Sequence, residues 1–175
     1  MKIETTQLKG ILIVKPDVYK DSRGYFYETY NYTDFDRLGI KNKFVQDNES
    51  MSEKGVLRGL HYQKNPFAQA KLVRVIKGAV LDVAVDIRKQ SSTYGQHFAI
   101  ELNEENKIML LIPEGFAHGF LTLADHTILG YKCSNVYNKE SEGAILWNDL
   151  TLRINWGIEN PVLSKKDKEG KPFIK

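Results

Sequence analysis

Short apolar segments separated by turn residues run along most of the chain, and helical periodicity is scarce. The segments recur at spacings of roughly 8 to 12 residues, a pattern typical of β-sandwiches and β-barrels. It predicts strands at residues 10–14, 24–30, 44–50, 56–63, 71–77, 80–87, 96–102, 107–112, 116–123, 127–133 and 144–148. One surface helix is predicted at 33–38, because Thr33 can cap its start and Gly39 can end it in a left-handed conformation. The sequence therefore predicts an all-β fold with short peripheral helices.

Two of these strands carry polar side chains where a buried face is expected. Asp82 and Asp86 share one face of the strand 80–87, opposite its aliphatic residues. On the predicted strand 116–123, His118 lies between two aromatic residues on one face. A barrel with a partly polar lumen can hold a ligand. Asp82 is a candidate for that lumen, whereas Asp86 is expected to pair with Arg88 or Arg74 near the rim.

Composition and charge narrow the class of protein. The chain has 175 residues, and we expect residues 1–175 to form a single domain. Lys and Arg number 25 against 22 Asp and Glu, and a net charge of +3 indicates neither a nucleic-acid partner nor a polybasic membrane surface. No apolar run approaches the about 18 residues of a membrane span, and no signal peptide is apparent. The one cysteine, Cys133, allows no intrachain disulfide, so a cytoplasmic location is expected.

The first candidate for chemistry is the segment 55–63, which contains Arg58 and His61. Strict alternation places these two side chains on opposite faces of a strand. Both can enter one pocket if Gly59 marks a β-bulge, a common role for a strand glycine. The alternative is a structural histidine beside a solvated surface arginine.

The second candidate is the turn and strand at 113–120, in which Pro113, Gly115 and His118 form a Pro-x-Gly-x-x-His pattern. This pattern resembles the second motif of the cupin superfamily, whose barrels often bind a metal through that histidine. A metal site needs more ligands, and no second histidine lies next to His61. His97 and His126, flanked by turn-like polar residues, are not expected to converge with it. We therefore expect a metal-free barrel.

Eight motifs stand in order along nearly the whole chain. They are DSRGYFYE at 21–28, FVQDN at 44–48, RGLH at 58–61, KLVRV at 71–75, DVAVDIR at 82–88, PEGFAHGF at 113–120, YKC at 131–133 and LSKKD at 163–167. Together they closely resemble the dTDP-4-dehydrorhamnose 3,5-epimerase family of the cupin superfamily. The resemblance implies a cupin-type double-stranded β-helix, or jelly-roll barrel, and an isomerase that forms a homodimer and needs no cofactor. The implied reaction converts the nucleotide sugar dTDP-4-dehydro-6-deoxy-D-glucose to dTDP-4-dehydro-L-rhamnose, toward dTDP-L-rhamnose for polysaccharide.

The resemblance also implies roles for individual residues. His61 is the implied proton acceptor, held by Asp167 in a dyad, and Tyr131 is the implied proton donor on the opposite face of the sugar. The residues implied around the sugar and the developing enolate are Arg58, Lys71 and His118, and the strand position of Asp82 makes it a further candidate near the sugar. The residues implied for the nucleotide are Arg23, Phe26, Glu28, Gln46, Asp47, Asn48, Tyr137, Glu142 and Lys166. In the family, the segment 23–28 reaches the site of the partner subunit.

These residue types suit the chemistry. A hydrogen next to a ketone is weakly acidic, so an imidazole base needs fixed cations that stabilise the enolate as it forms. His61 with Lys71 satisfies both demands, and a buried Asp167 would orient the imidazole. An enolate is basic enough to take a proton from a phenol such as Tyr131. Forked, permanently charged donors such as Arg23 and Arg58 suit a diphosphate.

Three alternatives stay open at this point. A mono-epimerase acting at C3 or C5 of another nucleotide 4-keto sugar would share most of these motifs. A metal-dependent cupin oxygenase would need further ligands, and a non-catalytic binding module could dispense with the proton-handling residues. Glu49 and Val136 stand where many family members have histidine and an aromatic residue, and we expect both near the nucleotide. The lysine-rich end at 165–175 is expected to be loose, so replacing Asp167 should affect turnover more than stability.

Overall fold

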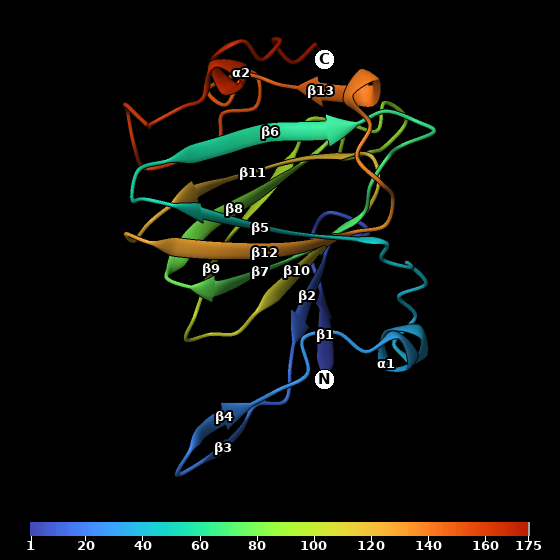
Figure 1. Cartoon of the computed structure of the whole chain (residues 1–175). Helices are drawn as coiled ribbons and strands as arrows, with labels where there is room; N and C mark the ends of the chain where they lie inside the picture. The colour runs from blue at the N-terminus through green and yellow to red at the C-terminus, as the bar shows by residue number, and fades with distance from the viewer. Residues whose placement is uncertain (175) are drawn as a thin grey trace.

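The computed structural model describes residues 1–174 and consists mainly of two antiparallel sheets that face each other (Figure 1). The six-stranded sheet has the order β1 (Lys2–Thr5), β2 (Leu12–Lys15), β10 (Met109–Ile112), β7 (Lys71–Lys77), β12 (Thr127–Cys133) and β5 (Gln46–Ser52). The five-stranded sheet has the order β13 (Glu142–Ala144), β6 (Leu57–Gln63), β11 (Phe116–Thr122), β8 (Ala79–Asp86) and β9 (His97–Asn103). The predicted all-β, cupin-type jelly-roll barrel is confirmed.

The main apolar core lies between the two sheets. It combines Val73 and Leu129 of the six-stranded sheet with Val80 and Phe120 of the five-stranded sheet, all almost fully buried. A second cluster, which includes Leu60 and Trp156, packs on the other face of the five-stranded sheet. Both faces of that sheet are therefore covered, and Figure 1 shows the C-terminal end of the chain above β6.

The alternation pattern located the central strands to within a few residues. Two short strands, β1 and β3 (Tyr19–Asp21), were not predicted, because KIET and YKD are polar and lie at sheet edges with little apolar contrast. Conversely, the predicted strand 24–30 ends at Phe26, because β4 (Gly24–Phe26) pairs only with β3. The predicted strand 144–148 overlaps β13 at Ala144 alone.

The predicted surface helix exists as α1 (Tyr32–Arg37), but its cap differs. Asn31, rather than Thr33, is the N-cap, and its side-chain oxygen accepts hydrogen bonds from the backbone of Thr33 and Asp34. Gly39 follows the helix with φ of +85°, the predicted left-handed conformation.

The C-terminal segment is ordered rather than loose, which corrects the expectation for 165–175; Lys175 lies outside the described residues. The short helix α2 (Lys165–Lys168) begins at Ser164 with a capping box. Beyond it, the backbone of Lys171 exchanges hydrogen bonds with Ala144 and Leu146, and the Phe173 ring is buried. A 3-10 helix at Lys139–Ser141 precedes β13. The segment is therefore anchored to the five-stranded sheet.

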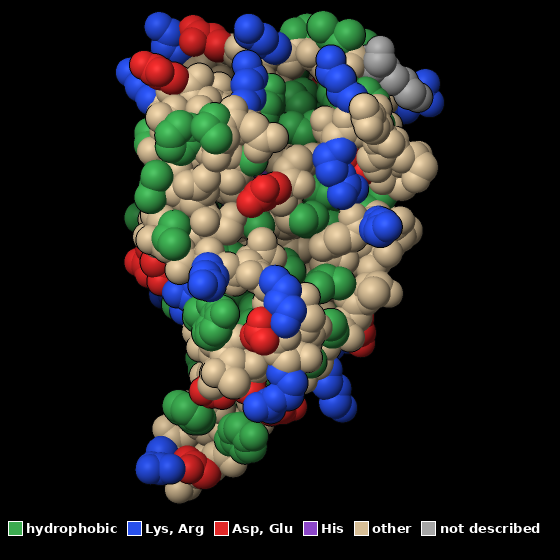
Figure 2. All heavy atoms as spheres, turned by 90° about the vertical axis from the view of Figure 1, so that its right-hand side faces the viewer, with side chains coloured by type: hydrophobic (Ala, Val, Ile, Leu, Met, Phe, Trp, Pro, Cys, Tyr) green, Lys and Arg blue, Asp and Glu red, His purple; other side chains and the backbone are tan. Residues whose placement is uncertain are grey.

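The β3–β4 hairpin projects away from the two sheets (Figure 1). Tyr19, Tyr25 and Phe26 are all more than half exposed there. Figure 2 shows hydrophobic side chains next to charged ones at this projecting end. The hairpin thus presents aromatic surface that this chain leaves uncovered.

Two further expectations concern charges and membranes. Asp86 pairs with Arg88 at 2.7 Å, one of the two predicted partners, and also accepts hydrogen bonds from Ser91 and Thr93. Arg74 instead lies on the outer face of the six-stranded sheet. Among residues 1–174, no helix combines the length and the apolar character that crossing a membrane requires.

Candidate active site

A cavity of about 530 Å³ opens between the two sheets at one end of the barrel. It gathers seven of the residues predicted from the sequence, namely Arg58, His61, Lys71, His118, Tyr131, Lys166 and Asp167. A smaller adjoining cavity shares four of these and adds Gln46, Asn48, Tyr137 and Glu142. Most of the predicted site is therefore one continuous hollow lined by both sheets and by α2.

The β-bulge predicted at Gly59 is confirmed, and it explains why Arg58 and His61 line the same cavity. The pairing of β6 with β11 is in register at His61 but shifts between His118 and Phe120. Gly59 has φ of +135°, and a Cβ there would lie 2.4 Å from the Cα of Gly119. Only glycine fits this close approach of two strands.

His61 and Asp167 form the predicted dyad, although they are 106 positions apart in the chain. His61 Nε2 lies 2.7 Å from Asp167 Oδ1. The carboxylate oxygen thus lies at hydrogen-bonding distance from the ring nitrogen, and the contact becomes an ion pair when the imidazole is protonated. The Asp167 side chain is buried and the imidazole is partly exposed to the cavity. This places a carboxylate behind a histidine that can meet a ligand.

Several donors surround the Asp167 carboxylate. Oδ1 also accepts the backbone N–H of Gly59 at 3.1 Å, and Oδ2 accepts the Ser164 hydroxyl at 2.5 Å. Burial raises the pKa of Asp167, but the bonds from His61, Ser164 and Gly59 outweigh it and lower the pKa to about 2. The carboxylate is therefore ionised at neutral pH and able to stabilise a protonated imidazole.

A second histidine–carboxylate pair lies beside the first. His118 is the direct cross-strand partner of His61, and its Nε2 lies 2.8 Å from Asp82 Oδ2. Asp82 is fully buried behind His118, and its Oδ1 has no protein partner within residues 1–174. Asp82 therefore holds His118 at the cavity wall and does not line the cavity itself.

The opposite wall of the cavity comes from the six-stranded sheet and carries Lys71 and Tyr131. The Lys71 ammonium lies 6.0 Å from the centre of the Tyr131 ring. Burial lowers the pKa of Lys71, and the nearby carboxylates of Asp82 and Glu142 oppose that change. Burial also raises the pKa of Tyr131, so its phenol keeps its proton at neutral pH. Tyr131 on this sheet and His61 on the five-stranded sheet therefore line opposite walls of the cavity.

The mouth of the cavity holds five of the residues predicted to contact the nucleotide. Gln46 Oε1 accepts the backbone N–H of Tyr137 at 2.8 Å, which fixes a ring that is 55% exposed. Gln46 also donates to Asn48, and Lys166 forms an ion pair with Glu142. An exposed aromatic ring next to amides and charges can stack on a base.

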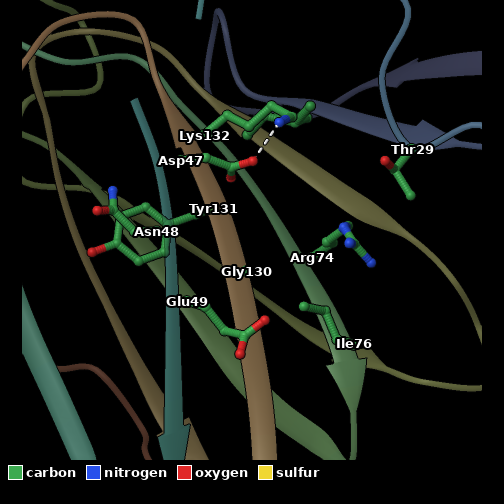
Figure 3. A pocket seen from close by; sticks show the side chains of 10 residues that line it. Thr29, Asp47, Asn48, Glu49, Arg74, Ile76, Gly130, Tyr131 and Lys132 are labelled. Atoms are coloured by element: carbon green, nitrogen blue, oxygen red, sulfur yellow. Dashed lines mark hydrogen bonds and ion pairs between the residues drawn. The ribbon is translucent and has the colours of Figure 1, made fainter. Parts of the chain in front are cut away.

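Besides Asp82, four predicted residues do not line either cavity in a single chain. Arg23, Phe26 and Glu28 lie on or just after the projecting hairpin, and Arg23 pairs with Asp21 at 2.6 Å. Asp47 points to the outer face of β5, where it pairs with Lys132 at 2.7 Å (Figure 3). Their contact with a ligand would have to involve a second chain.

Glu49, which was expected near the nucleotide, faces away from the lumen that Gln46 and Asn48 line. It lines a separate pocket on the outer face of the six-stranded sheet, together with Arg74 and Ile76 (Figure 3). Asn48 and Ser50 face the lumen, so alternation turns the residue between them outward. Val136, in contrast, lies exposed next to Tyr137.

Sequence reasoning missed two hydroxyls in the cavity. Ser50 Oγ is buried at the cavity wall without a protein partner among residues 1–174. Ser164 bonds Asp167 and lines the same cavity. The spacing of Ser164 and Asp167 is the capping-box pattern, a signal that could have located both the helix and the serine. Within the described residues, no group of three or more His, Cys, Asp or Glu side chains is arranged to hold a metal ion.

Comparisons with known proteins agree with this geometry. Residues 5–175 match the family model described as dTDP-4-dehydrorhamnose 3,5-epimerase. The chain is 50% identical to the dTDP-4-dehydrorhamnose 3,5-epimerase of Shigella flexneri, over 99% of this chain and 97% of that protein.

Solved structures give the same result. The dTDP-4-dehydrorhamnose 3,5-epimerase of Bacillus anthracis, with TDP and PPi bound, has a TM-score of 0.96 at 44% identity, covering 98% of this chain and 99% of that one. A dTDP-6-deoxy-D-glucose-3,5-epimerase of Legionella pneumophila, in complex with dTDP-4-keto-L-rhamnose, has a TM-score of 0.94 at 47% identity, covering 98% and 92%. The chain therefore belongs to the dTDP-4-dehydrorhamnose 3,5-epimerase family.

Proposed function

We propose that this protein converts dTDP-4-dehydro-6-deoxy-D-glucose to dTDP-4-dehydro-L-rhamnose by inverting C3 and C5. The observation that carries the proposal is the placement of His61, backed by Asp167, on one sheet and Tyr131 on the other. Inversion at a carbon requires a proton to leave from one face and return to the other. A sugar held between the two sheets meets a base on one side and an acid on the other.

Each inversion proceeds through an enolate. His61 takes the proton from the carbon next to the C4 ketone, the C–H electrons form the enolate double bond, and the negative charge moves to O4. The cation of Lys71 stabilises that charge as it develops, and Asp167 stabilises the protonated His61. Tyr131 then protonates the carbon from the opposite face and becomes a phenolate. His61 releases its extra proton to solvent and the phenolate takes one up from solvent, which restores both groups.

Lys71 suits this electrostatic role because the lumen removes it from bulk water. Burial lowers the pKa of its ammonium, while the carboxylates of Asp82 and Glu142 support the charged form. A cation in a confined cavity stabilises a developing enolate more strongly than the same cation in water. Arg58 is held at the cavity by a 3.1 Å hydrogen bond to Ser52 and suits the diphosphate.

The nucleotide contacts extend the proposal to a second chain. Gln46, Asn48, Tyr137, Glu142 and Lys166 would hold the nucleotide end from this chain. Arg23, Phe26 and Glu28 would come from the hairpin of a partner, since they lie outside the cavity of their own chain. The same pairing would cover the exposed aromatic rings of the hairpin.

The chain is expected to form a homodimer in solution. Burying Tyr19, Tyr25 and Phe26, which are 56 to 67% exposed in one chain, removes apolar surface from water and favours association. Sedimentation equilibrium at micromolar protein should give a mass about twice the 20.1 kDa of one chain. A mass near 20.1 kDa would contradict the homodimer and the shared nucleotide site.

Incubation of the proposed substrate in D₂O should place deuterium at both C3 and C5. Each carbon that loses a proton to His61 recovers one derived from solvent, so the label records where the enzyme acts. NMR or mass spectrometry of the product locates the deuterium. In Tyr131→Phe, His61 can still exchange protons with the sugar, so deuterium should still enter the substrate. Little fully inverted product is expected, because the proton donor on the opposite face is missing.

The labelling pattern separates the alternatives. Deuterium at one carbon only would indicate a mono-epimerase, and deuterium at neither would contradict the proposed reaction. Label with a GDP- or UDP-linked sugar but none with the dTDP sugar would move the proposal to another nucleotide. Val136, which lies next to Tyr137, would then be the first residue to exchange for an aromatic one.

A further inference from the structure

The two oxygens of Asp167 have different partners. Oδ1 faces His61 Nε2 at 2.7 Å and the Gly59 N–H at 3.1 Å. Oδ2 faces Ser164, whose hydroxyl donates at 2.5 Å and whose backbone N–H donates at 3.3 Å. Within residues 1–174, Ser164 supplies both hydrogen bonds that Oδ2 receives. One residue thus controls the half of the carboxylate that turns away from the histidine.

We propose that Ser164 is a positioning residue, whose hydroxyl sets how strongly Asp167 holds the protonated form of His61. The inference rests on the proposed function only in that His61 acts as the base. A short hydrogen bond from a hydroxyl to a carboxylate draws negative charge toward Oδ2. It also fixes the carboxylate plane, and therefore the position of Oδ1 relative to the imidazole.

Removing the hydroxyl would change the dyad in a defined direction. The charge of Asp167 would no longer be shared with Ser164 Oγ, so Oδ1 would attract the protonated imidazole more strongly. A base that holds its proton more tightly is available only at higher pH. The low pKa of Asp167, to which the Ser164 bond contributes, fits this account.

Other charged groups around the dyad come from several elements. Facing or near His61 and Asp167 are Arg58 of β6, Lys71 of β7, Asp82 of β8, His118 of β11, Tyr131 of β12, Glu142 of β13 and Lys166 of α2. None of them is altered by a substitution at Ser164. A change in pH dependence in such a variant therefore reports the lost serine hydroxyl.

Ser164 also has a purely structural duty that the test must separate. As the N-cap of α2, its Oγ accepts the backbone N–H of Asp167 at 3.2 Å. Glycine at an N-cap costs a helix only a few tenths of a kcal/mol, whereas alanine costs more. Ser164→Gly therefore keeps most of the stability of the helix cap but removes the hydroxyl that donates to Asp167. Ser164→Thr keeps both the cap and the hydroxyl.

The experiment measures kcat and kcat/KM for the dTDP sugar from pH 5 to 9 in the full-length protein and its variants. In Ser164→Gly and Ser164→Ala alike, we expect the acidic side of the kcat/KM profile to move up by about one pH unit. We expect kcat to fall about tenfold with KM nearly unchanged, because the substitution affects the dyad and leaves the nucleotide contacts in place. Ser164→Thr should resemble the wild type.

A second measurement avoids turnover altogether. NMR titration of the His61 imidazole in the substrate-free protein should show the same upward movement in Ser164→Gly. If the profile and the titration of Ser164→Gly match the wild type, Ser164 is only a helix cap and the inference is overturned. If the wild type does not turn over the dTDP sugar, the proposed function fails, while the NMR titration still decides the role of Ser164.

Discussion

His61→Asn is expected to fold, to bind dTDP and to lose turnover by about three orders of magnitude. Asparagine occupies similar space and can still donate a hydrogen bond to Asp167, but it cannot accept a proton from carbon. Removal of a general base costs about 10²- to 10⁴-fold. The upper part of that range applies because no other group on the same wall is placed to replace His61: His118 is its cross-strand neighbour but is bonded to the buried Asp82.

Steady-state kinetics with the dTDP sugar measures the loss, and calorimetry with dTDP measures binding. The matched control is His126→Asn, because His126 lies on the surface and pairs with Glu53 at 2.9 Å. The control should retain wild-type kcat. A His61→Asn variant with near wild-type turnover would remove His61 from the mechanism and leave the cavity without its base.

Asp167→Asn is expected to reduce kcat by about two to three orders of magnitude and also to destabilise the fold. The amide is neutral, so it no longer stabilises a protonated His61. Its NH₂ group must also face a donor, since every partner of the carboxylate in the structure donates. A buried donor without an acceptor costs about 1–3 kcal/mol. The sequence alone suggested that Asp167→Asn would have nearly unchanged stability. Because the structure buries Asp167 among donors, we expect a loss of stability instead.

The pH dependence of unfolding isolates the contribution of Asp167. Its pKa is lowered to about 2 in the folded protein from an ordinary value of 3.8. A lowered carboxyl pKa stabilises the fold above the unfolded value, and this stabilisation is lost as the pH falls through the folded value. The contribution is about 2 kcal/mol at neutral pH. Between pH 4 and pH 2, the free energy of unfolding should therefore fall by about 2 kcal/mol more in the wild type than in Asp167→Asn.

Urea unfolding at several pH values gives both free energies. Asp36→Asn is the matched control, because Asp36 is a surface carboxylate of α1 that pairs with Lys41. That control should unfold with the pH dependence of the wild type and should keep full activity. If Asp167→Asn instead keeps full activity while its stability drops, Asp167 is a structural residue only.

The sequence predicted the parts of the site that follow from strand alternation. Alternation placed His118 on an inward face, and the glycine in Arg58-Gly59 signalled the bulge correctly. Lys71 and Tyr131, which also line the lumen, were assigned to the site only by the family resemblance. The sequence did not predict that the C-terminal segment is ordered and buries Asp167 and Phe173. A lysine-rich composition suggests a solvated tail, whereas the burial of Asp167 depends on Gly59 and His61, which lie more than 100 positions away.

The exceptions on β5 have a different cause. The resemblance to family motifs suggested that Asp47 and Glu49 belong with Gln46 and Asn48, because the four are adjacent in sequence. A strand separates neighbours onto its two faces, and only Gln46 and Asn48 line the lumen. Whether the hairpin residues meet a ligand depends on a second chain, which no single-chain pattern encodes.

The late position of Asp167 has a consequence for synthesis of the protein. Every strand of the two sheets ends by Ala144, so a chain that stops before residue 167 still contains all of them. Such a chain would possess His61, Lys71 and Tyr131 but no partner for the base. Under the proposed function, such a product would also lack the buried Phe173, and we expect it to turn over little or no substrate. Turnover would then report that a given chain has been translated to its end.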